Sequence, residues 1–347
     1  MNREIPIVEY RYEEIYPSFK AGTDEKRITS DILHRFLRRA LPADPGRSAP
    51  IRVADVGSGP CDTILGYLES VDTPQGFVIR ATDIGDDYAA PDGIAMRTLA
   101  AAQRAGQIRI VDFAVSEDDS FAGKLASLVS AQGERAGHGR FDLVVASHMF
   151  YHADSPAGVE TLLGDAADNL LAARGILLMC HAAAPPGTFS YLRARYGRHS
   201  TRLDQSDTPA VNVGDPPRVT RDYFARRRLP LCEIAFSARL ELPGLSDADW
   251  RDFAHPECYA EIVKRSPEAA ENLRRLLFVT ERAPLEFAAD RSERGLVAYL
   301  AAACKVIESN HGSLPLAEWI QIGFRPGADP EFVTMVRGAA AAATPAS

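Results

Sequence analysis

The sequence predicts an α/β protein with a doubly wound, seven-stranded, mainly parallel sheet. Short β-branched runs alternate with stretches of helical periodicity, which is typical of a parallel sheet covered by helices on both faces. The first run, Ile51–Val56, leads into a glycine turn at residues 57–59 and then into helical spacing over Asp62–Leu68. Strand, glycine turn and helix in this order form the nucleotide-cradling unit of such sheets.

Six further runs are expected to complete the sheet. The runs at residues 141–146 and 175–179 are apolar apart from Asp142, as expected of central strands buried on both faces. The others lie at residues 77–82, 107–115, 231–242 and 318–324. Helical stretches at residues 62–68, 91–105, 123–139 and 155–170 separate the first five strands.

An aromatic segment, residues 9–19, and a helix precede the first strand. Tyr12 and Tyr16 belong to the aromatic segment. Thr23 is a good N-cap, and apolar residues recur at four-residue spacing up to residue 41, which predicts a helix. Glu25 falls in the first turn of this helix, where a carboxylate complements the helix dipole even without another role.

The alternation of strands and helices breaks down after the fifth strand. Further helices are expected near residues 188–196, 220–228, 246–253 and 292–305, with another from residue 266. The alanine-rich end, residues 338–347, is predicted to be a disordered tail.

Composition excludes several classes of protein. The 347-residue chain has a formal net charge of −8, which disfavours a nucleic acid or an anionic membrane as its main partner. No apolar run reaches the roughly 20 residues of a membrane span, and the charged N-terminus is unlike a signal peptide. The five cysteines are scattered without metal-ligand spacing, so a cytoplasmic protein without a metal is expected. The alanine- and arginine-rich usage indicates a bacterial chain.

Polar groups follow the strands where each one ends. In open parallel sheets ligands bind outside the carboxyl ends of the strands. Four such ends carry Gly57 and Gly59, Asp83, the loop to Ser120, and Ser147. Asp83 follows Gly57 by 26 positions (83 − 57), close to the roughly 20 expected for a carboxylate that binds ribose hydroxyls.

The glycine turn departs from the dinucleotide pattern. Cys61 stands where a phosphate needs bare backbone, and Asp55 inside the motif would repel a pyrophosphate but suit a cation. Asp55-x-Gly57-x-Gly59 resembles the first motif of class I S-adenosylmethionine-dependent methyltransferases. The resemblance implies a Rossmann-like fold and S-adenosyl-L-methionine as cofactor. Asp83 would bind its ribose, Gly57 and Gly59 its amino-acid part, Ser120 would lie near adenine and Ser147 near the sulfonium.

The end of the fourth strand is the stretch with the most candidate catalytic groups. Ser147 is followed by His148, and then by Tyr151 and His152. Two histidines and a tyrosine at a strand end can orient an amine and accept a proton near neutral pH. Alternatively, His148 is a structural residue and Tyr151 belongs to the core. His181, at the end of the fifth strand, is open to either interpretation.

The order of several blocks resembles the histamine N-methyltransferase group. The segment Tyr12-x-x-x-Tyr16-x-x-Phe19-x-x-x-Thr23-Asp24-Glu25 is similar to that family's aromatic segment and its Thr-Glu turn. The stretch from His148 to His152 is similar to the block after its fourth strand. Residues 189–197 and the Trp250…Cys258-Tyr259 segment look like two later blocks.

This resemblance implies a small-molecule methyltransferase with a helical substrate-binding lid. Glu25 would bind the amine and His148 or His152 would take its proton. The residues expected to shape the substrate pocket are Tyr12, Tyr16, Tyr151, Phe189 and Tyr259. Residues 1–337 would form one domain, with the lid at 1–45, the cofactor-binding core at 46–183, substrate-binding insertions at 184–316 and the last strand at 317–326.

The differences between this sequence and the histamine N-methyltransferase group concern the residues expected to bind the substrate. The family's glutamine is His148, its second tyrosine is His152 and its tryptophan is Phe189. Residues 314–319 occupy the place of its substrate-binding asparagine, and residues 280–312 form a longer insertion. The predicted reaction is methylation of a nitrogen of a small aromatic or heterocyclic amine, in specialised metabolism. The alternatives are C- or O-methylation of an indole-type or hydroxylated molecule, a nicotinamide-dependent oxidoreductase, and a non-catalytic binding module.

Overall fold

The computed structural model describes residues 12–41, 48–83, 90, 92–117, 140–150, 155–197, 215–280, 282 and 284–345. The chain divides into two compact units. The helical unit comprises residues 1–28, 183–214 and 237–318, and the sheet unit comprises residues 29–182, 215–236 and 319–347. The division falls within α2 (Glu25–Ala40), β6 (Leu231–Glu241) and β7 (Ser313–Gly323), each of which contributes residues to both units.

The seven predicted strands form one sheet in the order β3-β2-β1-β4-β5-β7-β6. The first five are β1 (Ile51–Val56), β2 (Phe77–Asp83), β3 (Ile110–Glu117), β4 (Phe141–Ser147) and β5 (Leu171–Ala183). These five pair in parallel throughout, with Val53 opposite Leu143 and Ile79. All three of these side chains are fully buried, as expected of strands covered on both faces.

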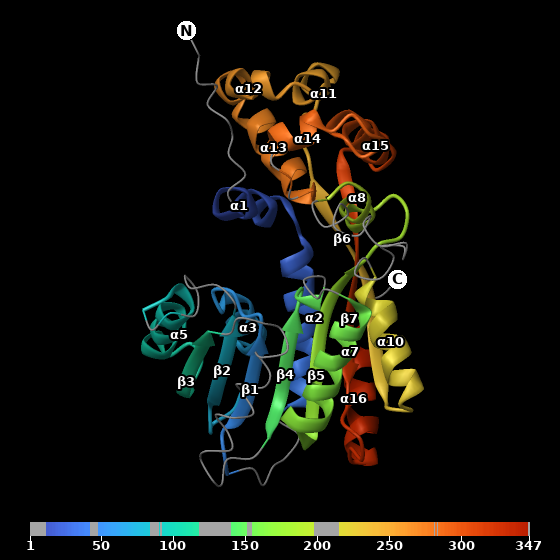
Figure 1. Ribbon diagram of the computed structural model, residues 1–347. Coiled ribbons are helices and arrows are strands. Elements are labelled where there is room, and N and C mark those ends of the chain that lie inside the picture. The colour runs from blue at the N-terminus through green and yellow to red at the C-terminus, as the bar shows by residue number, and fades with distance from the viewer. Residues whose placement is uncertain are drawn as a thin grey trace. The chain divides into compact units, whose positions relative to one another are not determined.

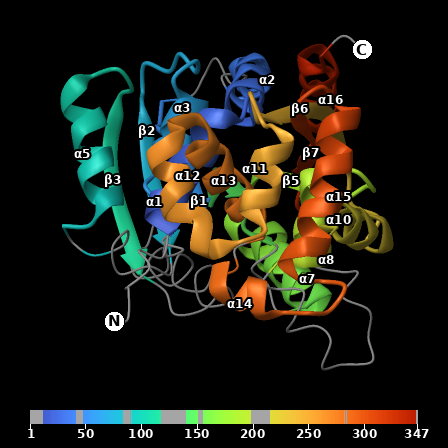
Figure 2. The same cartoon turned by 90° about the horizontal axis from the view of Figure 1, so that it is seen from above.

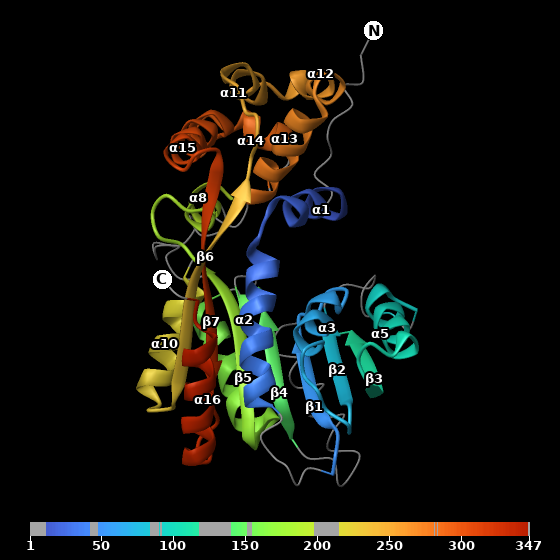
Figure 3. The ribbon, with the colours of Figure 1, turned by 180° about the vertical axis from the view of Figure 1, so that it is seen from behind.

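Helices cover both faces of the sheet. The helices α7 (Pro156–Asp165) and α10 (Pro216–Arg226) lie on one face (Figure 1), and α2 and α16 (Pro330–Ala343) lie on the other (Figure 3). Arg35 Nη2 donates to the carbonyl oxygen of Ala343 at 3.1 Å and joins α2 to α16. The shorter α3 (Asp62–Leu68) follows the glycine turn, and α5 (Ile94–Ala105) packs on β3.

The end of the chain differs from the prediction. We expected residues 338–347 to be disordered, yet residues 338–343 form the last part of α16. Alanine is the best helix former, and Ala339, Ala340 and Ala343 are buried, so this segment gains packing as well as propensity. An alanine-rich end therefore continues the helix here.

The helical unit is organised around α13 (Pro267–Thr280). It packs against α1 (Tyr12–Gly22), α8 (Phe189–Tyr196) and α12 (Tyr259–Arg265), the last of which lies beside it in Figure 2. The remaining helices are α11 (Asp247–Phe253), α14 (Pro284–Ala289) and α15 (Leu296–Ser309). Tyr299 of α15 donates its hydroxyl to the carbonyl of Leu276 at 2.8 Å, which fixes α15 on α13. Across the described ranges, no helix combines the length and apolarity needed to cross a bilayer.

Gly323, at the end of β7, is predicted to tolerate no side chain. A Cβ there would lie 2.7 Å from Cε1 of Phe224, whose ring is fully buried. Overpacking a core costs about 1–3 kcal/mol, so we expect Gly323→Ala to lower the free energy of unfolding in urea by about 2 kcal/mol. Gly338→Ala is the matched control, because no atom lies within 4 Å of its Cβ position and it is helical. It should gain about 0.5–1 kcal/mol; equal effects of the two substitutions would contradict the packing argument.

Candidate active site

The glycine turn after β1 is held by the end of β2. The backbone N–H groups of Gly57 and Ser58 both donate to the carbonyl oxygen of Thr82, at 2.9 and 3.0 Å. The N–H of Gly59 donates to Oδ2 of Asp83 at 2.7 Å. The two sequence motifs, the glycine pair and the later aspartate, are therefore joined by direct hydrogen bonds.

The conformation of this turn requires glycine. Gly57 has a φ of 70°, in the left-handed region that residues with a side chain rarely adopt. A Cβ on Gly57 would also lie 3.2 Å from Cβ of Met149. By contrast, no atom lies within 4 Å of the Cβ position of Gly59, so that side of the backbone is open to a ligand.

Cys61 begins α3 next to a group of carboxylates. It is buried in the left-handed conformation with a φ of 63°. Burial, and then the charge of Asp55, raise the pKa of the Cys61 thiol well above its usual range. The thiol therefore stays protonated and is no nucleophile at neutral pH. Asp55 is itself buried, at the end of β1.

One histidine follows the end of β4 and a second lies near the end of β5. Ser147 lies opposite Cys180 in the sheet, and its Oγ is 3.4 Å from the hydroxyl of Tyr67 on α3. His148 has a φ of 53°, and its N–H donates to the carbonyl oxygen of Cys180 at 2.8 Å. His181 is fully buried in the next position of β5. The sequence left the role of His181 open, and its neighbour His148 now makes it a candidate.

Some predicted site residues lie outside the described part of the chain. These are Ser120, Tyr151 and His152. Tyr12 is the first residue of α1, but its side chain is not described.

In the helical unit, Glu25 has a partner that the sequence analysis missed. Glu25 and Glu318 are 2% and 3% exposed, and their carboxylate oxygens lie within 4.8 Å of each other. Nζ of Lys26 is 3.7 Å from Oε2 of Glu25. Burial, and then the charge of Glu25, raise the pKa of Glu318 well above its ordinary value, and Lys26 opposes this. The pair therefore holds a proton more readily than two separate carboxylates and attracts cations.

This carboxylate pair predicts a pH dependence of stability. Because the folded protein raises the pKa of Glu318, its contribution to stability is complete below the unfolded value of about 4.5 and is lost as the pH rises through the folded value. We expect Glu318→Gln to be increasingly more stable than the wild type as the pH rises from about 4.5 to about 8. Urea unfolding across this pH range measures the difference in the free energy of unfolding. Glu268→Gln is the control, because Glu268 is exposed. Parallel curves for Glu318→Gln and wild type would disprove the assignment.

An aromatic cluster in the helical unit includes two of the predicted pocket residues. Tyr16 and Phe189 both lie near Phe278 of α13, with ring centroids 5.8 and 6.3 Å away. Phe19 stacks on Phe278 at 4.4 Å and contacts Phe189 at 5.3 Å. Tyr16, Phe19 and Phe189 lie in the sequence blocks that resemble the histamine N-methyltransferase group. Phe278 falls outside these blocks and was not predicted.

Tyr259 has a different environment. It is 2% exposed, and its hydroxyl donates to the carbonyl oxygen of Phe253 at 2.8 Å. Burial raises the pKa of this phenol well above its usual range. The hydroxyl thus joins α11 to α12, and the place of Tyr259 in a substrate pocket stays a prediction.

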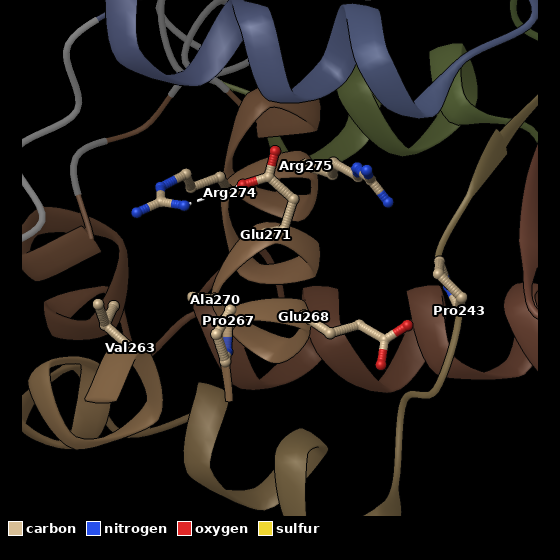
Figure 4. Close-up of a pocket in the computed structure, with 8 residues that line it drawn as sticks. All are labelled: Pro243, Val263, Pro267, Glu268, Ala270, Glu271, Arg274 and Arg275. Atoms are coloured by element: carbon tan, nitrogen blue, oxygen red, sulfur yellow. Dashed lines mark hydrogen bonds and ion pairs between the residues drawn. The ribbon is translucent and has the colours of Figure 1, made fainter. Parts of the chain in front are cut away.

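Figure 4 shows an open pocket of about 490 Å³ beside α13. Three of its four charged groups are already engaged: Arg274 pairs with Glu271 at 2.9 Å, and Arg275 donates to the carbonyl oxygens of Ser18 and Glu241. Such pairing is typical of a structural surface. The lining residues are Pro243, Val263, Pro267, Glu268, Ala270, Glu271, Arg274 and Arg275.

The strand order decides the fold class. A glycine turn after β1, a carboxylate at the end of β2, and the order 3-2-1-4-5-7-6 occur together. This is the class I methyltransferase fold. The predicted Rossmann-like, doubly wound sheet is confirmed.

No family model and no curated protein matches the chain. Among solved structures it is similar to the CurJ carbon methyltransferase, with a TM-score of 0.37 and 16% identity over 63% of this chain and 50% of that one. It thus spans half the length of that protein. A cyclopropane-fatty-acyl-phospholipid synthase-like protein from Lactobacillus casei has a TM-score of 0.42 and 14% identity, over 90% and 100% of the two chains. A SAM-dependent methyltransferase from Thiobacillus denitrificans has a TM-score of 0.34 and 15% identity, over 85% of this chain and 97% of that one.

Proposed function

We propose that this protein is an S-adenosylmethionine-dependent methyltransferase that acts on a nitrogen of a small aromatic or heterocyclic amine. The hydrogen bond between Asp83 and the N–H of Gly59 carries the proposal, because it joins a carboxylate to an open glycine backbone at the carboxyl ends of β1 and β2. This is where a doubly wound sheet binds a nucleoside.

The residues at these strand ends suit the cofactor. The carboxylate of Asp83 is partly exposed and can accept hydrogen bonds from ribose hydroxyls. The open side of Gly59 leaves room for a ligand against the backbone. The buried carboxylate of Asp55 lies close enough to Cys61 to act on its thiol and favours a cationic ligand over a phosphate. S-Adenosyl-L-methionine supplies an electrophilic methyl group on a sulfonium when it is bound.

The helical unit would bind the acceptor. Glu25, beside Glu318, would accept a hydrogen bond from the amine and fix the direction of its lone pair. The rings of Tyr16, Phe189 and Phe278 would favour a flat, cationic molecule. His148 would then take the proton that the nitrogen loses once it has been methylated. Since a thioether needs no proton to leave, the protein's main task is alignment and exclusion of water.

Methylation of a ring carbon or a hydroxyl is the second candidate. A histidine base at the end of β4 suits these acceptors as well as an amine. The buried carboxylates Glu25 and Glu318 favour the amine, because a cation balances their charge.

Calorimetric titration with S-adenosylhomocysteine, with NADH as control, tests the reaction class. We expect micromolar binding of the first and none of the second. Absence of S-adenosylhomocysteine binding would refute the proposal. Mass spectrometry of products from a panel of aromatic amines, indoles and phenols would then identify the acceptor and distinguish N- from C- or O-methylation.

A further inference from the structure

His181 is a buried polar side chain without a hydrogen-bond partner among the described residues. It is fully buried at the end of β5, and among the described residues neither ring nitrogen has a hydrogen-bond partner. Its ring stacks on Phe150 with centroids 4.7 Å apart. Leaving a buried donor or acceptor unsatisfied costs about 1–3 kcal/mol. A phenylalanine or leucine would pack on Phe150 without that penalty, so packing alone leaves the imidazole unexplained.

The imidazole of His181 is neutral under ordinary conditions. Burial, and then the charge of His148, lower its pKa to about 3. A neutral imidazole has one N–H donor and one nitrogen acceptor. His181 can therefore form hydrogen bonds with a neighbour, but it is a poor proton store at neutral pH.

His148 is close enough to His181 for its charge to act on the imidazole. Ser147 pairs with Cys180 in parallel register, so His148, directly after β4, and His181, within β5, come next on adjacent strands. The N–H of His148 is fixed to the carbonyl oxygen of Cys180 at 2.8 Å. Its φ of 53° is unusual for a residue with a side chain and costs about 1–3 kcal/mol. Strain that persists at a strand end is typical of a functional position.

We propose that His181 is a positioning residue for His148: in the cofactor-bound protein, its neutral ring accepts a hydrogen bond from one ring N–H of His148. This fixes the His148 tautomer and leaves the lone pair of the other nitrogen directed at the acceptor. The inference rests on the proposed methyltransferase function. In that reaction the acceptor's lone pair forms the new bond to the methyl carbon and the C–S bond pair stays on sulfur. The acceptor's proton passes to the other ring nitrogen of His148.

The test is ¹⁵N NMR of the histidine rings with S-adenosylhomocysteine bound. His148→Asn identifies the His148 signals. In the wild type we expect a single His148 tautomer; interconversion between both tautomers would overturn the proposal without any variant. His181→Phe keeps a ring on Phe150 but removes both nitrogens, and should release His148 into a mixture of tautomers.

The same variants separate positioning from a structural role. We expect His181→Phe to lower kcat about tenfold, the effect of one modest hydrogen bond, with S-adenosylhomocysteine affinity within about twofold of wild type. His181→Gln retains an acceptor and should restore the single tautomer, and it replaces His181→Phe if that protein does not fold. An unchanged tautomer in His181→Phe, or a mixture in His181→Gln, would overturn the proposal. Failure of S-adenosylhomocysteine to bind wild type would instead refute the methyltransferase assignment.

Discussion

Replacing Glu25 with glutamine is expected to lower turnover about a hundredfold and to leave S-adenosylhomocysteine affinity within about twofold of wild type. A hydrogen bond to a charged group contributes about 1.5–3 kcal/mol, and glutamine keeps the shape but loses the charge that attracts the amine. The same substitution removes one of two buried carboxylates within 4.8 Å of each other. The variant should therefore be more stable than wild type at neutral pH.

These opposite effects make the result interpretable. Loss of activity with a raised melting temperature excludes unfolding as the cause. Glu268→Gln is the control, because Glu268 is an exposed carboxylate of the same unit, and it should change neither property. Steady-state kinetics, calorimetry and thermal unfolding supply the three measurements. An equal loss of turnover and cofactor affinity would contradict the assignment of Glu25 to the acceptor.

Asp83→Ala is expected to weaken S-adenosylhomocysteine binding by about a hundredfold or more. The substitution removes the carboxylate proposed to bind the ribose, and charged hydrogen bonds of this kind contribute about 1.5–3 kcal/mol each. It also removes the acceptor for the N–H of Gly59 and loosens the turn. Calorimetric titration measures the dissociation constant.

Asp112→Ala provides the matched control for Asp83. Asp112 lies on the neighbouring strand β3, where its side chain is 55% exposed and pairs with Arg80 at 2.6 Å. Exposed ion pairs contribute about 0–1 kcal/mol, so this variant should bind S-adenosylhomocysteine like the wild type. If both substitutions weakened S-adenosylhomocysteine binding equally, the negative charge at the sheet would govern binding, and a specific contact with Asp83 would be contradicted.

The sheet was predictable because its strands are buried on both faces. Runs such as Ile51–Val56, which is apolar apart from Arg52 and Asp55, are expected only where both sides of the sheet are covered, so they mark central strands directly. The glycine turn and Asp83 were predictable for a related reason, since their roles depend on backbone conformation and strand ends, which are local features.

The partners of the candidate acceptor site were not predictable from local features. Glu318 follows an apolar run in β7, and its closeness to Glu25 joins residues almost 300 positions apart in the sequence. Phe278 lies in α13, where the helical pattern marks it only as a core residue. One signal was available: Glu318 lies in the stretch that replaces the asparagine of the similar family.

The turn between β1 and α3 has a thermodynamic consequence. Fixing the backbone of one residue costs about 1–2 kcal/mol of conformational entropy at 25 °C. Here the N–H groups of Gly57, Ser58 and Gly59 are held by Thr82 and Asp83 through hydrogen bonds within the protein. The conformational entropy of this loop is therefore lost during folding and not during binding, so a ligand binds to a turn that is already ordered. Any substitution that loosens this turn will weaken ligand binding, even if the substituted residue does not contact the ligand.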